Sequence, residues 1–302
     1  MPSFSDATEY GLRRLSDRDF QIYAARMLKA LRDERKENAI AYYQPVSKRA
    51  MMVHESTAKV LGVGGGNGSS KTESCLVEVV ACATGVFPAS LQHLAKQKYC
   101  GPIQCRVVVE SFLTTLEPII LPKLRWSHWT GADEPDGLRG HWGWIPRDCL
   151  LGGEWDKSYS SKLHILTLIS RDPFDRSIVR GESQIQFTSK DQDASDFASG
   201  EFKLILHDEP PEFAQWRENE ARAMRVNGRM LLAMTWPDDA SIAVDWIYDK
   251  IYEPGLPGPR RDKSIEWLEL HTTDNKMADQ EAVRAQMAKW SKATSSVRIY
   301  GQ

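Results

Sequence analysis

The chain has 302 residues and a mass of 34.2 kDa, enough for one large domain or two modest ones with a sizeable buried core. With 41% hydrophobic and 26% charged residues, its composition excludes a disordered, collagen-like or coiled-coil protein. The formal net charge of −2 does not favour a strongly basic nucleic-acid binder, although a net sum conceals local basic patches.

The chain begins with a charge-rich segment that is predicted to be helical over residues 1–40. Apolar side chains recur there at helical spacing, at Phe20, Tyr23, Met27, Leu28 and Leu31, and Asp17 is the predicted N-cap. The first residues contain no signal-peptide apolar region, and no apolar run reaches the ~18 residues needed to cross a bilayer. We therefore expect a cytoplasmic protein without membrane contact.

The cysteines are too few and too scattered for a disulfide framework. Cys100 and Cys105 are separated by four residues, but no second Cys or His pair follows at the spacing of a zinc site. We expect small buried thiols in a reducing compartment.

From about Val46 to Ile251, short apolar runs alternate with helical patterns. Strands are predicted at 59–64, 105–110, 162–169, 183–189, 203–207 and 229–235. Helices are predicted at 72–84, 111–121, 214–226 and 240–252. Continuous apolar strands separated by helices indicate an α/β fold, with a mostly parallel sheet and helices on both faces.

Two segments interrupt this alternation. Residues 126–161 are rich in Trp, Gly and Asp and are predicted to be a long insertion, without recognisable chemistry. Residues 253–262 form a Pro/Gly-rich break, followed by a predicted strand at 264–270 and a predicted helix at 277–292. We therefore divide the chain into a helical segment at 1–40, a core at 41–252 and a small subdomain or linker at 253–302.

The most informative segment is KVLGVGGGNGSSKTESC, in which a strand leads into a glycine-rich turn and then a helix. Glycines let the backbone approach a ligand closely, and successive N–H groups at a helix N-terminus bind phosphate oxygens. Lys71 is placed to reach the β- and γ-phosphates, and the Thr72 hydroxyl is placed to bind Mg²⁺. Ser70 stands where this motif normally has its last glycine, so a plain glycine-rich turn is the alternative.

A second signal is the apolar strand in FKLILHDEPPEF, which ends in Asp208 and Glu209. A strand-end Asp holds Mg²⁺ in phosphate-loop enzymes, and a neighbouring Glu can act as the general base on water. The alternative is a solvated acidic turn. The Glu favours hydrolysis over phosphoryl transfer to another acceptor.

The strand in RMLLAMTWP ends in Thr235, which we expect beside the acidic strand. A hydroxyl at this position can sense the γ-phosphate. It can equally be an ordinary strand-end threonine, and the sequence does not separate the two.

Taken in order, these segments resemble the ATPase domain of the large terminase subunit of tailed bacteriophages, the motor that packages DNA into procapsids. GGNGSSKT (65–72) is similar to the GGNRSGKT that is typical of the family's phosphate loop. YYQP (42–45) with His54 looks like its adenine-side segment, and LLAMTWPDD (231–239) looks like its coupling segment. The resemblance covers about residues 40–302.

The resemblance implies a P-loop NTPase fold of the additional-strand, catalytic-glutamate type, which hydrolyses ATP with Mg²⁺ to drive double-stranded DNA into the procapsid. Glu209 would activate water and Thr235 would couple hydrolysis to movement. Mg²⁺ would be held by Thr72 and Asp208. The nucleotide would be bound by Tyr43, Gln44, Gly65, Gly66, Asn67, Gly68, Ser69, Ser70, Lys71 and Thr72.

The chain departs from the family pattern at two arginine positions. Gly68 replaces the loop arginine, and Ala198-Ser199-Gly200 stands where the family often has the Arg-Gly of its trans-acting arginine finger. Other basic residues would then have to supply the finger, and the candidates are Arg139, Arg171, Arg176, Arg180, Arg222 and Arg225.

The resemblance also implies partners. These are double-stranded DNA contacted through its backbone, the portal protein, the small terminase subunit, and further copies of the chain in a ring, with a monomer in isolation. The location would be the host cytoplasm and, transiently, the portal vertex of the procapsid. The family's second domain is an RNase H-like nuclease, for which the 302 residues leave no room, so we expect no DNA cleavage.

Three other functions remain open at this point. A helicase-like DNA-dependent ATPase would need a second motor domain, and a phosphotransferase would need an acceptor pocket. A nucleotide-gated scaffold with little hydrolysis would fit the two departures within the phosphate loop, at Gly68 and Ser70.

Overall fold

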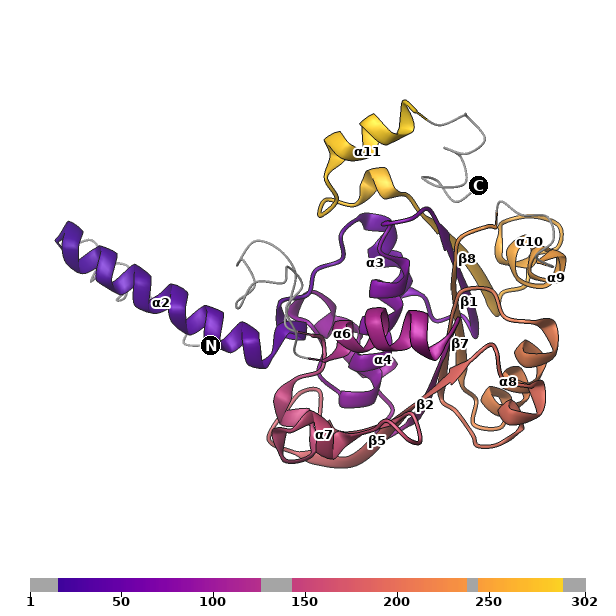
Figure 1. Ribbon diagram of the computed structural model, residues 1–302, viewed down its shortest axis with the longest axis horizontal. Helices are drawn as coiled ribbons and strands as arrows, with labels where there is room; N and C mark the ends of the chain where they lie inside the picture. Colours follow the sequence, from indigo (N-terminus) through magenta and orange to yellow (C-terminus); the bar gives the residue numbers. More distant parts are fainter. Residues whose placement is uncertain (1–15, 126–142, 238–243, 290–302) are drawn as a thin grey trace.

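The computed structural model describes residues 16–125, 143–237 and 244–289 (Figure 1). In this part of the chain one eight-stranded sheet forms the centre, in the order β3-β4-β5-β2-β6-β7-β1-β8. The strands are β1 (Val60–Gly65), β2 (Gln104–Val109), β3 (Tyr159–Ser160), β4 (Ile165–Arg171), β5 (Val179–Ser189), β6 (Leu204–Asp208), β7 (Arg229–Met234) and β8 (Ile265–Leu270). In this spatial order, all neighbouring strands from β5 through β2, β6, β7 and β1 to β8 pair in parallel. At the other edge, β3 pairs with β4 and β4 pairs with β5 in antiparallel fashion.

Strand β7 defines the type of sheet. It lies between the phosphate-loop strand β1 and the acidic strand β6 and pairs with both in parallel. The predicted α/β fold with a mostly parallel sheet is thereby confirmed.

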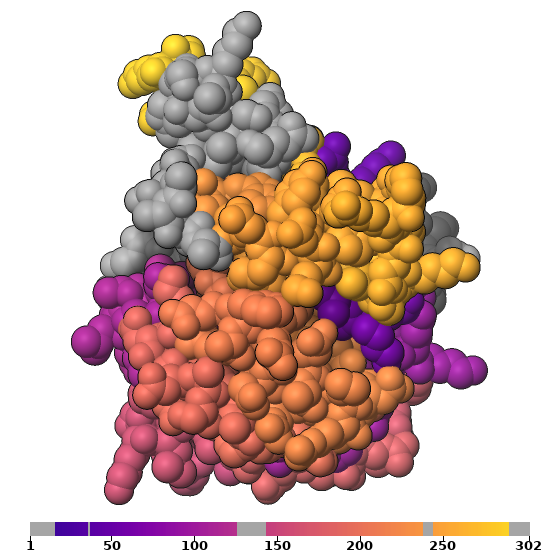
Figure 2. Space-filling model, turned by 90° about the vertical axis from the view of Figure 1, so that its right-hand side faces the viewer, coloured from indigo at the N-terminus to yellow at the C-terminus, as the bar shows by residue number. Residues whose placement is uncertain are grey.

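Helices cover both faces of the sheet, as predicted (Figure 1). One face carries α3 (Lys48–Glu55), α4 (Lys71–Thr84) and α6 (Leu121–Leu124), and the other carries α8 (Phe213–Met224), α9 (Asp245–Ile247) and α10 (Glu253–Gly255). Figure 2 looks onto this second face, most of which is formed by the salmon and orange segments. The remaining helices are α2 (Asp17–Glu37), α5 (Ala95–Lys98), α7 (Trp155–Ser158) and α11 (Gln280–Met287).

The central helix α4 is buried over nearly its whole length. It ends at Gly85, whose left-handed φ of 75° is the usual helix-terminating conformation. A Cβ at Gly85 would lie 2.0 Å from the carbonyl oxygen of Arg171, so the end of α4 packs directly on the backbone at the end of β4.

Several element predictions differ from the structure. The N-cap of α2 is Ser16 rather than Asp17, because the Ser16 hydroxyl accepts from the Asp19 N–H at 3.2 Å. The predicted helix at 111–121 is a wider π-helix over Phe112–Ile120, which contains Pro118 and its missing N–H. Of the predicted helix at 240–252, residues 240–243 lie outside the described residues, and the remainder is α9 and a π-helical turn over Tyr248–Tyr252.

The described part of the predicted insertion is built into the core. Residues 143–161 form short 3₁₀ turns, α7 and β3. Trp144, Ile145, Cys149 and Leu150 are buried there, so the segment after residue 142 is a structural edge of the sheet rather than a free loop.

The sheet continues beyond residue 252, where we placed the end of the core. Strand β8 pairs with β1 from Val60–Ile265 to Gly65–Leu270. Its Trp267 ring lies flat across β1, because a Cβ at Gly62 or Gly64 would come within 2.1 or 2.6 Å of the indole. These two glycines therefore make room for a side chain that fixes β8 in the sheet.

The described cysteines are all free thiols, and Cys75, Cys82, Cys105 and Cys149 are buried as expected. Cys100 differs, because it is exposed. Among the described residues no single helix is long and apolar enough to cross a membrane. By length and composition alone, a bent pair of α4 with residues 89–98 passes that test.

A buried ionic cluster joins α4 to the elements around it. The Glu78 carboxylate accepts from Lys98 Nζ at 2.5 Å, Arg229 Nη1 at 3.0 Å and His54 Nδ1 at 3.2 Å. Burial alone would raise the pKa of Glu78, but the His54 hydrogen bond and the charges of Lys98 and Arg229 outweigh it and hold this pKa well below its usual range. Lys98 and Arg229 also both donate to the Ser56 carbonyl, which fixes the chain just before β1.

We predict that Glu78→Gln lowers the free energy of unfolding by about 3–5 kcal/mol, because it leaves buried cations without their counter-charge. Urea denaturation followed by circular dichroism measures this. Glu154→Gln removes an exposed partner of Lys157 and should change stability very little. Equal effects of the two variants would show that the Glu78 cluster adds no more stability than a surface ion pair.

Candidate active site at the carboxyl edge of the sheet

The phosphate loop connects β1 to α4 at the carboxyl edge of the sheet. Gly68 and Ser70 have left-handed φ values of 76° and 75°. The Ser70 side chain makes no cap bond to the first turn of α4, which begins directly after the loop. A helix N-terminus of this kind attracts anions.

Ser70 departs from the glycine that the motif predicts, but its backbone keeps the glycine conformation. A left-handed φ costs an L-residue roughly 1–2 kcal/mol, because Cβ crowds the carbonyl oxygen. The loop therefore keeps the expected path at the expense of local strain.

Lys71 lies inside the loop. Its Nζ donates to the Gly66 carbonyl at 3.2 Å and to the Thr235 hydroxyl at 2.9 Å. The Thr235 hydroxyl in turn donates to the Gly65 carbonyl at 3.1 Å. Burial lowers the pKa of Lys71, although the nearby Glu209 and Asp208 carboxylates oppose this shift. Thr235 thus joins the tip of β7 to both the lysine and the loop.

Thr72 and Asp208 lie in direct contact. The Thr72 hydroxyl donates to Asp208 Oδ1 at 2.7 Å, and burial raises the pKa of Asp208 despite this bond. A hydroxyl and a carboxylate are oxygen ligands of the kind that Mg²⁺ prefers. The described residues contain no cluster of three or more His, Cys, Asp or Glu that could hold a metal. An ion between Thr72 and Asp208 would therefore take its other ligands from phosphate and water, as is usual for Mg²⁺.

Glu209 follows Asp208 in a left-handed conformation, with φ 88°. Its N–H donates to the Ala233 carbonyl at 2.8 Å, so β7 holds the turn in place. Burial, helped by the neighbouring Asp208, raises the pKa of Glu209 to about 7, against the opposing charge of Lys71. A carboxylate with a pKa near neutrality is well matched to accept a proton at physiological pH.

The two residues of the adenine-side segment differ in exposure. The Tyr43 side chain is buried, its hydroxyl lies 3.0 Å from His54 Nε2, and its ring packs edge-on against Trp144 at 5.3 Å. Gln44 is exposed. In this structure Tyr43 is part of the core, and contact of Tyr43 or Gln44 with a base stays a prediction.

The described candidates for the arginine finger lie toward the opposite edge of the sheet, near the end of α4 or the start of β7. Arg171 and Arg176 pair with Asp148, and Arg180 pairs with Asp172, around the β4–β5 turn. Arg222 pairs with Glu218 on α8, Arg225 is exposed after the same helix, and Arg139 lies outside the described residues. None of the five described arginines is near the phosphate loop of its own chain, and action on a neighbouring copy stays a prediction.

Arg106 is buried behind the segment where the family carries its finger. Its guanidinium donates to the carbonyls of Phe197 and Ser199 and to the side chains of Gln186 and Asn219. All five N–H donors are thereby satisfied by neutral acceptors, and burial lowers the pKa of Arg106 to about 10. The side chain thereby holds residues 197–199 to β2.

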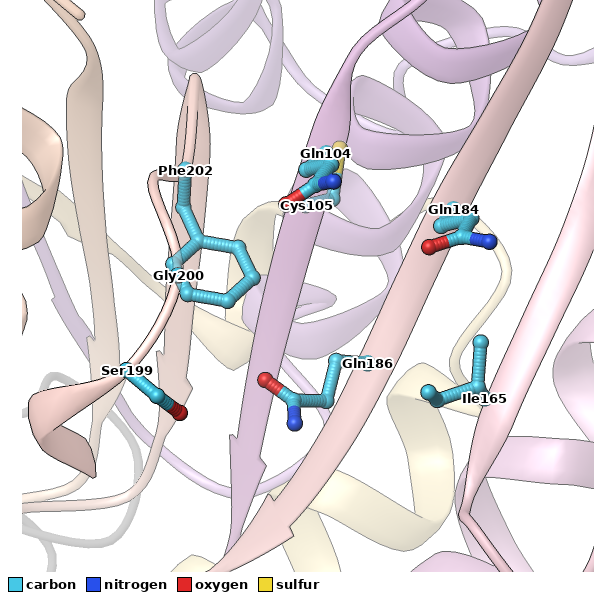
Figure 3. A pocket seen from close by; sticks show the side chains of 8 residues that line it. All are labelled: Gln104, Cys105, Ile165, Gln184, Gln186, Ser199, Gly200 and Phe202. Carbon is cyan, nitrogen blue, oxygen red and sulfur yellow. The ribbon is translucent and has the colours of Figure 1, made fainter. Parts of the chain in front are cut away.

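A small pocket lies beside this arginine, over β2 and β5 (Figure 3). It has a volume of about 150 Å³ and is lined mainly by the amides of Gln104, Gln184 and Gln186 together with Phe202. None of the predicted site residues lines it.

Sequence reasoning missed several side chains around the loop. Lys123 forms an ion pair with Glu73 at 2.6 Å, in the first turn of α4, and its charge helps to lower the pKa of Asp208 against the effect of burial. Thr272 and Asn275, just after β8, hydrogen-bond to the phosphate loop. No motif marks any of these residues, and only the fold brings them to the site.

The fold and these contacts bring a glycine-rich loop, a buried lysine and two carboxylates together at one edge of a mostly parallel sheet. No family model matches the chain, and a search of curated proteins finds no match either. Solved structures do match. Over 86% of this chain and 94–95% of theirs, the ATPase domain of the Thermus phage P74-26 large terminase and a point mutant of it superpose with a TM-score of 0.51 at 14% identity.

The large terminase of the thermophilic bacteriophage D6E also has a TM-score of 0.51, at 10% identity. The match covers 86% of this chain but 54% of the D6E chain, so this chain spans about half of that protein's length. The chain therefore has the fold of phage large terminase ATPase domains.

We predict that Ser70→Gly raises the free energy of unfolding by about 0.5–1 kcal/mol, because it removes the left-handed strain while adding some freedom to the unfolded chain. Urea denaturation measures the change. Ser111→Gly is the matched control, since Ser111 has an extended φ of −154° and glycine there only adds unfolded-state freedom. Loss of stability in both variants would mean that Ser70 is not strained.

A second prediction concerns pH in nucleotide-free and metal-free protein. Because the pKa of Glu209 rises from 4.5 to about 7 on folding, the unfolded state loses this proton first, and stability falls as pH increases between these values. Glu209→Gln should therefore match the wild type near pH 4.5 and exceed it by about 3 kcal/mol above pH 7. A stability difference that does not change with pH would contradict the raised pKa.

Proposed function

We propose that this protein hydrolyses ATP with Mg²⁺ as the motor domain of a phage large terminase and thereby drives double-stranded DNA into the procapsid. One observation carries the proposal. Five predicted side chains lie together at one edge of the sheet: Lys71, Thr72, Asp208, Glu209 and Thr235. They do so in the fold of phage large terminase ATPase domains.

The contacts suggest how the chain would perform hydrolysis. Lys71 would exchange its bonds to the Gly66 carbonyl and the Thr235 hydroxyl for oxygens of the β- and γ-phosphates. Thr72 and Asp208 would hold Mg²⁺, which neutralises charge on the phosphate oxygens. Glu209 would orient the attacking water and accept its proton.

Thr235 is the proposed coupling residue. Its hydroxyl contacts Lys71 and Gly65, and its N–H lies 3.5 Å from Glu209 Oε2. When Lys71 turns toward a phosphate, Thr235 loses one partner, so the tip of β7 would respond to occupancy of the site.

Assembly and DNA contact are parts of the same proposal. Copies of the chain would form a ring on the portal, with the small terminase subunit, in the host cytoplasm. An arginine from a neighbouring copy would stabilise the transition state, which is worth ~10³–10⁵ in rate where it operates. DNA would be held through its phosphate backbone, without sequence specificity.

The loop has Gly68 where the family pattern has an arginine, so the loop itself offers no arginine to contact phosphate. This supports the alternative of a nucleotide-gated scaffold. The two functions predict the same binding of nucleotide. They differ in turnover, which the experiment below measures.

We expect Lys71→Ala to abolish binding of Mg-ATPγS in calorimetry, because no other described cation lies inside the loop. We expect Glu209→Gln to bind normally but to lower ATP turnover 10²- to 10⁴-fold, the usual loss for a general base. Lys157→Ala, at an exposed ion pair with Glu154, is the control and should match the wild type in both assays.

Normal nucleotide affinity in Lys71→Ala would remove the phosphate-loop assignment. Turnover that survives in Glu209→Gln would remove Glu209 as the base. Tight binding with no turnover by the wild type, with or without DNA and portal, would favour the scaffold.

A further inference from the structure

A short segment after β8 holds the phosphate loop from outside. We call residues 271–280 the strap. The Thr272 hydroxyl donates to the Asn67 carbonyl at 2.8 Å, and Asn275 Nδ2 donates to the Gly68 carbonyl at 2.7 Å. Thr272 is buried, with 4% of its surface exposed. Two consecutive loop carbonyls are thus bound by side chains that lie more than 200 positions later in the chain.

These bonds fix the orientation of two peptide groups. In a trans peptide the C=O and the following N–H point in opposite directions. Holding the Asn67 and Gly68 carbonyls on the strap side therefore directs the N–H groups of Gly68 and Ser69 toward the interior of the loop. The Ser69 N–H does point inward, because it lies 3.3 Å from the Gly66 carbonyl that also accepts from Lys71.

The strap is anchored to α3 near its start and runs into the first residue of α11 at its end. Near its start, Arg49 of α3 donates to the carbonyl of Glu269 at 3.0 Å and lies 2.7 Å from His271 Nε2. At its far end, Gln280 Nε2 donates to the Asn275 carbonyl at 2.8 Å. Gln280 is the first residue of α11, so the loop, the strap and α11 are joined by a continuous series of hydrogen bonds.

We propose that Thr272 and Asn275 are positioning residues that preorganise the phosphate loop and link its occupancy to α11. This inference rests on the proposed binding of nucleotide at the loop. Because coupling between two sites is reciprocal, phosphate that tightens the loop also tightens the strap.

The test is a split between binding and turnover. Thr272→Val and Asn275→Ala should each raise the Kd for Mg-ATPγS about three- to tenfold, the usual worth of one hydrogen bond. The rate at saturating ATP should change less than twofold, because neither side chain touches the reacting atoms. Thr272→Ser keeps the hydroxyl and should bind like the wild type, so it separates loss of the bond from loss of packing.

Two matched controls each remove a side-chain bond to a backbone carbonyl away from the phosphate loop. One lies in the last turn of α4 and the other in the turn that follows it. The Thr84 hydroxyl donates to the Val80 carbonyl at 2.7 Å, and Gln92 Nε2 donates to the Pro173 carbonyl at 2.7 Å. Thr84→Val and Gln92→Ala should leave nucleotide affinity unchanged, whatever they do to thermal stability.

Amide hydrogen exchange tests the link to α11 directly, because side chains that only stabilise the fold would not change the protection that nucleotide gives to residues 271–287. In the wild type, Mg-ATPγS should slow amide exchange across residues 271–287, and this protection should be weaker in Thr272→Val and Asn275→Ala when both are saturated. Wild-type affinity and wild-type protection in both variants would overturn the strap and leave the proposed function intact. Failure of the wild type to bind nucleotide would instead overturn the proposed function.

Discussion

The parallel pairing of β7 with β1 on one side and β6 on the other is the constraint on which the site depends. It aligns Gly64 with Met234 and Asp208 with Ala233, so three strands end at the same level. Asp208 is the last residue of β6, Thr235 directly follows β7, and the loop after β1 leads to Lys71. A slip of one residue in either register would turn Thr235 or Asp208 to the other face of the sheet. The contacts of Lys71 and Thr72 are thus consequences of backbone hydrogen bonds that involve neither side chain.

The site combines buried charge with backbone strain. The buried ammonium of Lys71 faces the carboxylates of Asp208 and Glu209. Burial lowers the pKa of the lysine and raises the pKa of both acids, so each neutral form is favoured. Ser70 and Glu209 both adopt left-handed conformations next to these groups. Such features are tolerated only where the surrounding structure over-determines them. The Glu78 cluster beneath α4 and the strap above the loop supply that support.

Features encoded within a few neighbouring residues were predictable from the sequence. The strand before the loop, the loop itself, the acidic pair and the strand that ends at Thr235 all lie close to their predicted places. The phosphate-loop path was predictable even though Ser70 breaks the motif, because a strand and a helix flank it. The roles of these residues in binding and catalysis stay predictions, which the geometry supports.

Features that depend on distant contacts were not predictable. The Pro/Gly break suggested that the core ends at residue 252, whereas β8 continues the sheet and its Trp267 packs over β1. That position cannot be predicted without knowing the order of the strands. Tyr43 matches an adenine-side motif by its sequence, yet Trp144, a hundred residues away, packs against it in the core. Thr272 and Asn275 stand in an ordinary polar turn by composition, and only the pairing of β8 with β1 brings them to the loop.

The indole of Trp267 has a consequence for how variation in this chain is interpreted. Gly62 and Gly64 precede the phosphate loop by only a few residues, and any larger side chain there would push β8 away from β1. Substitutions at these positions would therefore reduce activity by detaching the strand that carries the strap, without altering any group that faces the ligand. In a mutational survey, glycines that leave room for a neighbouring strand and glycines that bind phosphate would be equally intolerant. Only compensation by a smaller residue at position 267 would distinguish the first kind from the second.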